Sequence, residues 1–437
     1  MRSFSLSQLA SALRIDDAGK AMHELIRELY PLCRSVTGDG VRETLRIVGR
    51  ELPLEIHETP SGTRVLDWVV PPEWNVREAW LKGPDGQIVA DLRWSNLHVV
   101  GYSVPVHAKL SLAELRPHLF SLPEHPDWIP FRSSVYREDW GFCLPHRRLE
   151  ALAEGEYEVR IDATLSNGSL TYGEALLPGE TDEEVLLSSH VCHPSLCNDN
   201  LSGIALLSLL GRYLASVTHR YTYRLLFAPV TIGALTWLAQ NESVLPRIRH
   251  GLVVTLAGDS GPITYKRSRR GNAAIDRAFV HVLSHHGPHA VREFDPFGYD
   301  ERQFCSPGFD LPMGCLMRTP HGEFPEYHTS ADDLDFVKPH ALKDSLAALL
   351  GVLDVLEHER CFRNLQPKGE PQLGRRGLLG TAAWGGSLQR AMAWVLNLSD
   401  GHNSLLDIAE RSRLPFAMVH EAASQLFSHD LLAPVDR

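Results

Sequence analysis

The sequence predicts an α/β protein: a three-layer sandwich in which helices flank a mostly parallel sheet, with a small inserted β-rich domain and a C-terminal winged helix. Three observations lead to this prediction. Strand-like and helix-like segments alternate over residues 157–358, short alternating runs fill residues 58–156, and three short helices follow a Pro- and Gly-containing linker. Strands that alternate with helices are typical of a mostly parallel sheet covered on both faces.

The N-terminal segment, residues 1–57, is predicted to be helical and to belong to the core. Residues 1–20 are polar and amphipathic, and they lack the apolar run of a secretory signal. Apolar residues recur at helical spacing from Met22 to Tyr30, and a second amphipathic run covers residues 41–52.

Residues 58–156 are predicted to form the inserted antiparallel β domain, because turn sequences such as Pro-Pro and Gly-Pro-Asp-Gly separate short alternating runs. The core then resumes over residues 157–362. Its strands are predicted at 158–163, 184–189, 223–228 and 251–256, and its helices at 202–214, 232–241, 272–285 and 339–358. In such sheets, functional groups collect at the carboxyl ends of the strands.

Residues 363–384 are predicted to be a linker, and residues 385–437 a winged-helix-like domain with helices at 388–396, 404–411 and 415–426. This domain contains only a few cations, including Arg390, Arg411 and Arg413, against several acids. A helix that reads DNA needs cations for the phosphates. An interaction or oligomerisation role is therefore favoured over DNA binding, and a homo-oligomer is compatible with the sequence.

Composition narrows the protein class further. The 437 residues carry a formal net charge of −11, which disfavours bulk nucleic-acid binding. No run of 18 or more uncharged apolar residues is present, so no membrane partner is expected. Seven scattered cysteines do not form a disulfide framework, and a cytoplasmic location is the simplest expectation.

The stretch from 185 to 203 carries the clearest chemistry, because an apolar strand ends at His190 and a loop with further potential ligands precedes a helix. Imidazole and carboxylate groups at a strand end are suited to zinc. His190 is favoured as the zinc ligand because it ends the strand, and His193 is the alternative ligand. Cys192 and Cys197 are interpreted as buried thiols.

Residues 199–203 resemble the Asp-Asn-x-Ser-Gly motif of the co-catalytic di-zinc aminopeptidases of clan MH. The resemblance implies that Asp199 bridges metals and that His190, Asp259 and His328 are ligands. Motifs at 193–203, 265–271 and 325–332 resemble a narrower aminopeptidase-like group, which has an inserted β-rich, jelly-roll-like domain of unknown function and a C-terminal winged helix.

The chain departs from this family where Glu-Glu-x-Gly is expected, since Val230 and Thr231 replace the two glutamates. Val cannot accept a proton, and neutral Thr is a poor zinc ligand. One zinc ion per chain is therefore favoured over two.

Three acids are candidates for the catalytic role that Val230 cannot fill. Glu326 comes first, because it lies two residues before His328 and would share its face in an extended segment. Glu301 is a further substitute, and Asp300 falls where the family has an Asp-containing loop. A solvated loop position is the alternative for Glu326. The four cations of residues 265–271 are candidates for binding a substrate anion, with a solvated loop as the alternative.

The favoured hypothesis is a zinc-dependent aminopeptidase-like hydrolase that cleaves an N-terminal peptide or amide bond of a small or specialised substrate. The alternative is a catalytically weak or repurposed metal-binding protein. A transcriptional regulator is disfavoured by the charge of the C-terminal domain.

Overall fold

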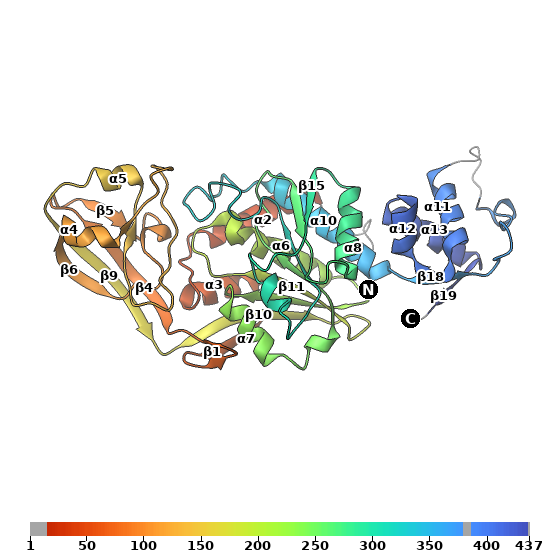
Figure 1. Cartoon of the computed structure of the whole chain (residues 1–437), viewed down its shortest axis with the longest axis horizontal. Coiled ribbons are helices and arrows are strands. Elements are labelled where there is room, and N and C mark those ends of the chain that lie inside the picture. The colour runs from red at the N-terminus through yellow and green to blue at the C-terminus, as the bar shows by residue number, and fades with distance from the viewer. Residues whose placement is uncertain (1–14, 379–385, 436–437) are drawn as a thin grey trace.

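The computed structural model describes residues 15–378 and 386–435 as three bodies in a row, with the insert and the winged helix at opposite ends of the core (Figure 1). Residues 1–14, part of the predicted N-terminal helical segment, lie outside the described residues. Within the described ranges, no helix is both long and apolar enough to cross a lipid bilayer.

The core is built on an eight-stranded sheet whose four central strands run parallel, while antiparallel pairs occur on both sides. The sheet is thus mixed rather than mostly parallel. In spatial order its strands are β1 (Glu55–Pro60), β10 (Ser169–Leu177), β12 (Thr222–Ala228), β11 (Glu184–His190), β13 (Ile248–Val254), β16 (Met313–Met317), β14 (Ile263–Lys266) and β15 (His289–Arg292). Every residue of β11 and β12 is buried, as expected for central parallel strands.

Helices cover both faces of this sheet and confirm the predicted layers. One hydrophobic cluster packs α2 (Ile15–Leu29), α3 (Asp39–Val48), α6 (Ser202–Leu214), α8 (Ala274–Ser284) and α10 (Pro339–His358). A second cluster on the other face includes Trp237 of α7 (Ile232–Gln240) and Phe304 of α9 (Glu301–Phe304).

The insert is a four-stranded antiparallel sheet in the order β5 (Ile88–Asp91), β4 (Glu73–Lys82), β9 (Glu156–Ser166), β6 (Val106–Ser111). The predicted boundaries 58–156 are therefore wrong: the insert runs from β4 through β9, and the strand expected at 158–163 is not in the core. A jelly roll has eight strands in two sheets, which this sheet does not provide. Short elements complete it: α4 (Leu112–Leu115), β7 (Leu119–Phe120), β8 (Phe142–Cys143) and α5 (His146–Glu150).

A hairpin of β2 (Arg64–Val65) and β3 (Trp68–Val69) precedes the insert and packs on α7 of the core. This hairpin, too, lies outside the insert, although residues from 58 onward were predicted to belong to it.

The winged helix contains the three predicted helices, α11 (Ser387–Leu398), α12 (Leu405–Ser412) and α13 (Phe416–Ser428). Its sheet, in the order β18 (Asp400–Ser404), β17 (Cys361–Asn364), β19 (Leu432–Val435), begins before the predicted linker. The domain therefore starts near residue 361, and the predicted linker start at residue 363 falls inside β17. Residues 379–384 of the predicted linker lie outside the described residues. Arg277 of α8 pairs with Asp407 (2.7 Å) and Glu410 (2.5 Å), which ties the winged helix to the core.

A charged clamp joins the core to the first strand of the insert. The Nη1 and Nη2 atoms of Arg42 in α3 donate to the Glu73 carboxylate of β4, at 2.8 and 2.7 Å. The backbone N–H of Ser169 in β10 also donates to Glu73, at 2.9 Å. These bonds lower the pKa of Glu73 to about 2, with the Arg42 hydrogen bond as the largest cause.

Replacing Glu73 with glutamine should lower the free energy of unfolding by about 2 kcal/mol at pH 7, because a bidentate charge-assisted pair is lost. The pKa is depressed in the folded state. The carboxylate therefore stabilises the protein fully above its ordinary pKa of 4.5, and this contribution disappears as the pH falls toward about 2. Urea unfolding should thus show that the wild type has a higher free energy of unfolding than Glu73→Gln, and that this difference becomes smaller as the pH is lowered.

Glu43→Gln is the matched control for this prediction, because Glu43 pairs with Arg46 on the exposed side of the same helix. Exposed pairs contribute little. If both variants lose the same free energy of unfolding at pH 7, the Arg42–Glu73 pair stabilises the protein no more than an exposed ion pair does.

Candidate metal centre

The site forms where β11 ends, and a hydrogen-bonded frame holds the loop that follows. The Asn200 amide donates to Ser189 Oγ (2.8 Å), and its oxygen accepts from the Leu256 N–H (3.2 Å). A Cβ on Gly203 would lie 2.5 Å from the Val254 carbonyl oxygen, so α6 can approach β13 this closely only with glycine there. Ser202 Oγ in turn accepts from the Ala257 N–H (2.9 Å). Hydrogen bonding by Asn200 and Ser202 and close packing at Gly203 thus explain the Asn-x-Ser-Gly part of the motif.

Asp332, which the sequence interpretation did not assign to the site, supports the same loop. Its carboxylate accepts from the backbone N–H groups of Asn198 (2.6 Å) and Asp199 (2.9 Å). It lies four residues after His328, so the ligand loop 326–332 also fixes the backbone of the loop that carries Asp199. The only sequence signal was its place in the motif at 325–332.

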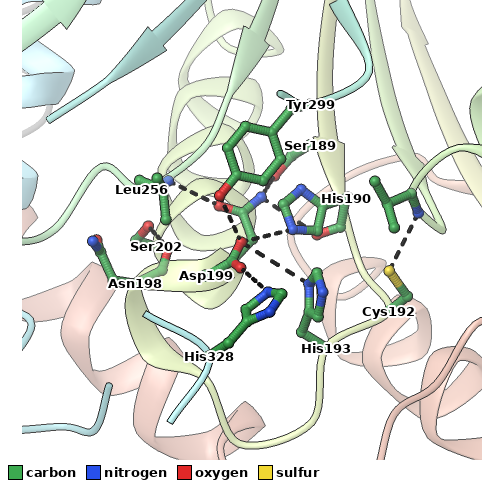
Figure 2. Close-up of polar contacts among 12 residues, drawn as sticks. Ser189, His190, Cys192, His193, Asn198, Asp199, Ser202, Leu256, Tyr299 and His328 are labelled. Atoms are coloured by element: carbon green, nitrogen blue, oxygen red, sulfur yellow. Dashed lines mark hydrogen bonds and ion pairs between the residues drawn. The ribbon is translucent and has the colours of Figure 1, made fainter. Parts of the chain in front are cut away.

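Asp199 is the centre of a cluster of imidazoles (Figure 2). His190 Nε2 lies 3.0 Å from Asp199 Oδ1, and His328 Nε2 lies 3.0 Å from Asp199 Oδ2. His193 Nδ1 lies 4.0 Å from Asp199 Oδ1. The side chains of Asp199 and His190 are 0% and 1% exposed, whereas those of His193 and His328 are 10% and 33% exposed.

The donor set fits a zinc ion. Ligand atoms of His190, His193 and Asp199 lie within 4.8 Å of one another. His193 Nδ1 is buried and has no hydrogen-bond partner in the described part of the chain, and burial lowers the pKa of this imidazole to about 3. Burial opposes ionisation of Asp199, but the surrounding imidazoles, His193 first, hold its pKa well below its usual range. Neutral imidazoles around a carboxylate are typical zinc ligands.

The structure brings three of the four predicted ligands together, and it adds His193, which had been the second choice to His190. It places Asp259 elsewhere. Both Asp259 oxygens already accept hydrogen bonds, from Thr319 Oγ1 (2.6 Å), Gly261 N (2.7 Å), Asn198 Nδ2 (3.0 Å) and Thr319 N (3.2 Å). Since β13 ends at Val254, Asp259 is no strand-end residue, and the intervening loop turns it toward Thr319.

Of the acids predicted to be catalytic, Asp300 directly follows a residue that contacts the cluster. It follows Tyr299, whose hydroxyl donates to Asp199 Oδ1 (3.3 Å) and whose ring stacks on His190. Asp300 itself is buried and accepts from the Thr231 N–H (2.8 Å). Burial raises the pKa of Asp300 to about 6. Tyr299 was missed, because a tyrosine before an acidic residue carries no signal of its own.

Glu301 and Glu326 are placed differently from the prediction. Glu301 is buried and pairs with Lys266 at 2.5 Å, away from the cluster. Glu326 is half-buried in a segment built of turns, and His328 has a φ of +56°. The segment is therefore not extended, so the reason for expecting the side chains of Glu326 and His328 on the same face does not apply.

The basic segment 265–271 is not a free anion site. Each of its four cations pairs with a carboxylate of this chain: Lys266 with Glu301, Arg267 with Glu293, and Arg269 and Arg270 with Asp310.

Thr231, at the position of the family's second glutamate, has a φ of +63° at the start of α7. Left-handed backbone is costly for a β-branched residue and is a common feature of functional sites. The N–H of Val230 next to it donates to Cys192 Sγ (3.2 Å). The backbone that would carry the two glutamates is thus held in place beside Asp300.

Known proteins resemble this chain over most of its length. A protein of Clostridium acetobutylicum, named for polysaccharide biosynthesis and an aminopeptidase-like domain, is 48% identical over 420 residues, which cover 95% of this chain and 96% of the relative. A crystal structure from the same organism, named as a peptidase, has a TM-score of 0.93 at 46% identity and covers 98% of this chain and all of that one.

More distant structures share the fold. A zinc aminopeptidase of Bacillus subtilis has a TM-score of 0.57 at 12% identity, covering 76% of this chain and 94% of its own. Residues 360–434 match a winged helix-turn-helix family, and residues 23–359 match a family described as a domain of unknown function, DUF4910. The chain therefore belongs to the DUF4910 family, with a zinc aminopeptidase-like core and a C-terminal winged helix.

Proposed function

We propose that this protein is a zinc-dependent amide hydrolase that removes an N-terminal or N-acyl group from a small, specialised substrate. The observation that carries the proposal is the buried Asp199 carboxylate among the imidazoles of His190, His193 and His328. Zinc held by these residues would polarise the scissile carbonyl and lower the pKa of a water molecule.

The residues of the chain then have to take up and deliver a proton. Val230 cannot accept a proton, and Glu301 forms an ion pair with Lys266. Asp300 is the best-placed acceptor, because it contacts the backbone of Thr231, where the family carries its glutamates. A positioned acid–base group contributes roughly 10² to 10⁴-fold to such reactions.

One observation favours the alternative of a metal-binding protein without hydrolytic activity. Four protein ligands close the tetrahedral shell of zinc, whereas catalytic sites keep one position open. If His193 binds zinc together with His190, Asp199 and His328, the shell is full. Which of the two functions holds depends on whether substrate can displace one of these ligands.

Metal analysis combined with an activity panel tests the proposal. Protein purified without chelator should contain one zinc ion per chain, because Thr231 and Asp259 do not supply ligands for a second. It should cleave aminoacyl anilides or N-acetylated amino sugars. We choose the second class as a probe because the clostridial relative is named for polysaccharide biosynthesis. A chelator should abolish this activity, and added zinc should restore it.

Each other outcome has a clear meaning. Two zinc ions per chain after dialysis would reveal a second site. One zinc ion without cleavage of either substrate class would support the non-hydrolytic alternative.

A further inference from the structure

A segment of the insert is joined by backbone hydrogen bonds to the loop that carries His328. The Phe131 N–H donates to the His328 carbonyl oxygen (2.8 Å), and the Ser330 N–H donates to that of Ile129 (2.8 Å). The Ile129 N–H donates to Ser330 Oγ (2.9 Å). The insert is therefore part of the framework of the metal centre, although most of it lies at the far end of the molecule (Figure 1).

The Phe131 ring packs on two of the proposed ligands. Its centre lies 5.2 Å from that of His193 and 5.1 Å from that of His328, and both contacts are edge-to-face. Tyr327 stacks on His328 with ring centres 4.0 Å apart. His193 and His328 are also the two ligands whose side chains retain some exposure, whereas His190 and Asp199 are closed off. Phe131 thus stands on the open side of the cluster.

We propose that Phe131 is a positioning and specificity-determining residue of the metal centre, contributed by the insert. Its ring fixes the orientation of the His193 and His328 imidazoles. The same ring forms the wall against which an uncharged, apolar or ring-shaped group next to the scissile amide packs. The second part of this proposal rests on the proposed function, and the first part does not.

The positioning role follows from geometry. Edge-to-face ring contacts have a preferred direction, so they restrict rotation of an imidazole in a way that aliphatic packing does not. Partners that orient metal ligands typically contribute 10 to 100-fold to metal affinity. Phe131 offers no polar side-chain atom, so a substrate group beside it gains from apolar contact and not from charge pairing.

Zinc affinity, measured by competition with a chromogenic chelator, tests the positioning role without any turnover. Phe131→Ala should weaken zinc binding about tenfold, and Phe131→Tyr, which keeps the ring, should retain it. Trp128→Ala is the matched control, because Trp128 lies in the same segment but stacks on His125. It should leave zinc affinity unchanged.

Selectivity between substrates tests whether the Phe131 ring forms a wall of the substrate site. The wild-type ratio of kcat/KM for phenylalanyl over alanyl anilide should fall about tenfold in Phe131→Ala and stay constant in Phe131→Tyr and Trp128→Ala. A folded Phe131→Ala variant with unchanged zinc affinity and an unchanged ratio would overturn the proposal. A wild type that cleaves no amide would overturn the proposed function and the wall with it, while zinc affinity would still decide the positioning role.

Discussion

Asp199→Asn is expected to remove zinc from the protein and to abolish any metal-dependent hydrolysis. The substitution keeps the shape of the side chain and removes its negative charge. Because three imidazoles surround this one carboxylate, its charge is the main attraction for a cation at the centre of the cluster. Loss of zinc affinity should exceed about 100-fold, since substitutions of groups that only orient ligands already cost 10 to 100-fold.

Asp259→Asn provides the control, and it decides between the site expected from the sequence and the site in the structure. Asp259 accepts four hydrogen bonds and lies outside the cluster, so this variant should keep its zinc. It should still be less stable, by about 1–3 kcal/mol, because buried donors lose a charged acceptor. Elemental analysis and thermal unfolding of both variants check these outcomes. If Asp259→Asn loses as much zinc as Asp199→Asn does, Asp259 is a zinc ligand after all.

The strand end at His190 and the family resemblance pointed to His190, Asp199 and His328, and the structure places these three side chains together. That they bind zinc stays a prediction. A run that begins with Val185, Leu186 and Leu187 predicts a buried strand from local sequence alone, so the residue that ends it, His190, is well defined. The position of Asp259 was not predictable in this way. It lies five residues beyond its strand, and the loop conformation that turns it toward Thr319 depends on a distant segment.

The misplaced insert boundary has a similar cause. Strand β9 alternates like an edge or half-buried strand, and it lies next to β10 in sequence. Two pairings show that β9 belongs to the insert. Its partner β4 lies 75 or more residues earlier in the sequence, and its partner β6 lies about 50 residues earlier. Non-local pairing of this kind leaves no local signal. The Phe131 contact with the ligand loop was missed for the same reason.

Asp300→Asn should lower kcat by about 10² to 10⁴-fold while zinc stays bound. Asparagine can still accept the hydrogen bond from the Thr231 N–H, so the loop should keep its place, but it cannot take up a proton. Glu326→Gln serves as the control. Glu326 lies on a loop of turns, and among the described residues no side-chain hydrogen bond directs it to the cluster, so its substitution should lower kcat less than tenfold.

A second substitution separates loss of a proton acceptor from a general disturbance of the site. Val230→Glu places a carboxylate at the family's own position, beside the backbone that Asp300 contacts. Combined with Asp300→Asn, it should restore part of the lost kcat at unchanged zinc content, because the missing function is proton uptake and not structure. The measurement is amide hydrolysis by zinc-loaded wild type, both single variants and the double variant. A larger loss in Glu326→Gln than in Asp300→Asn, with no recovery in the double variant, would assign the proton acceptor to Glu326.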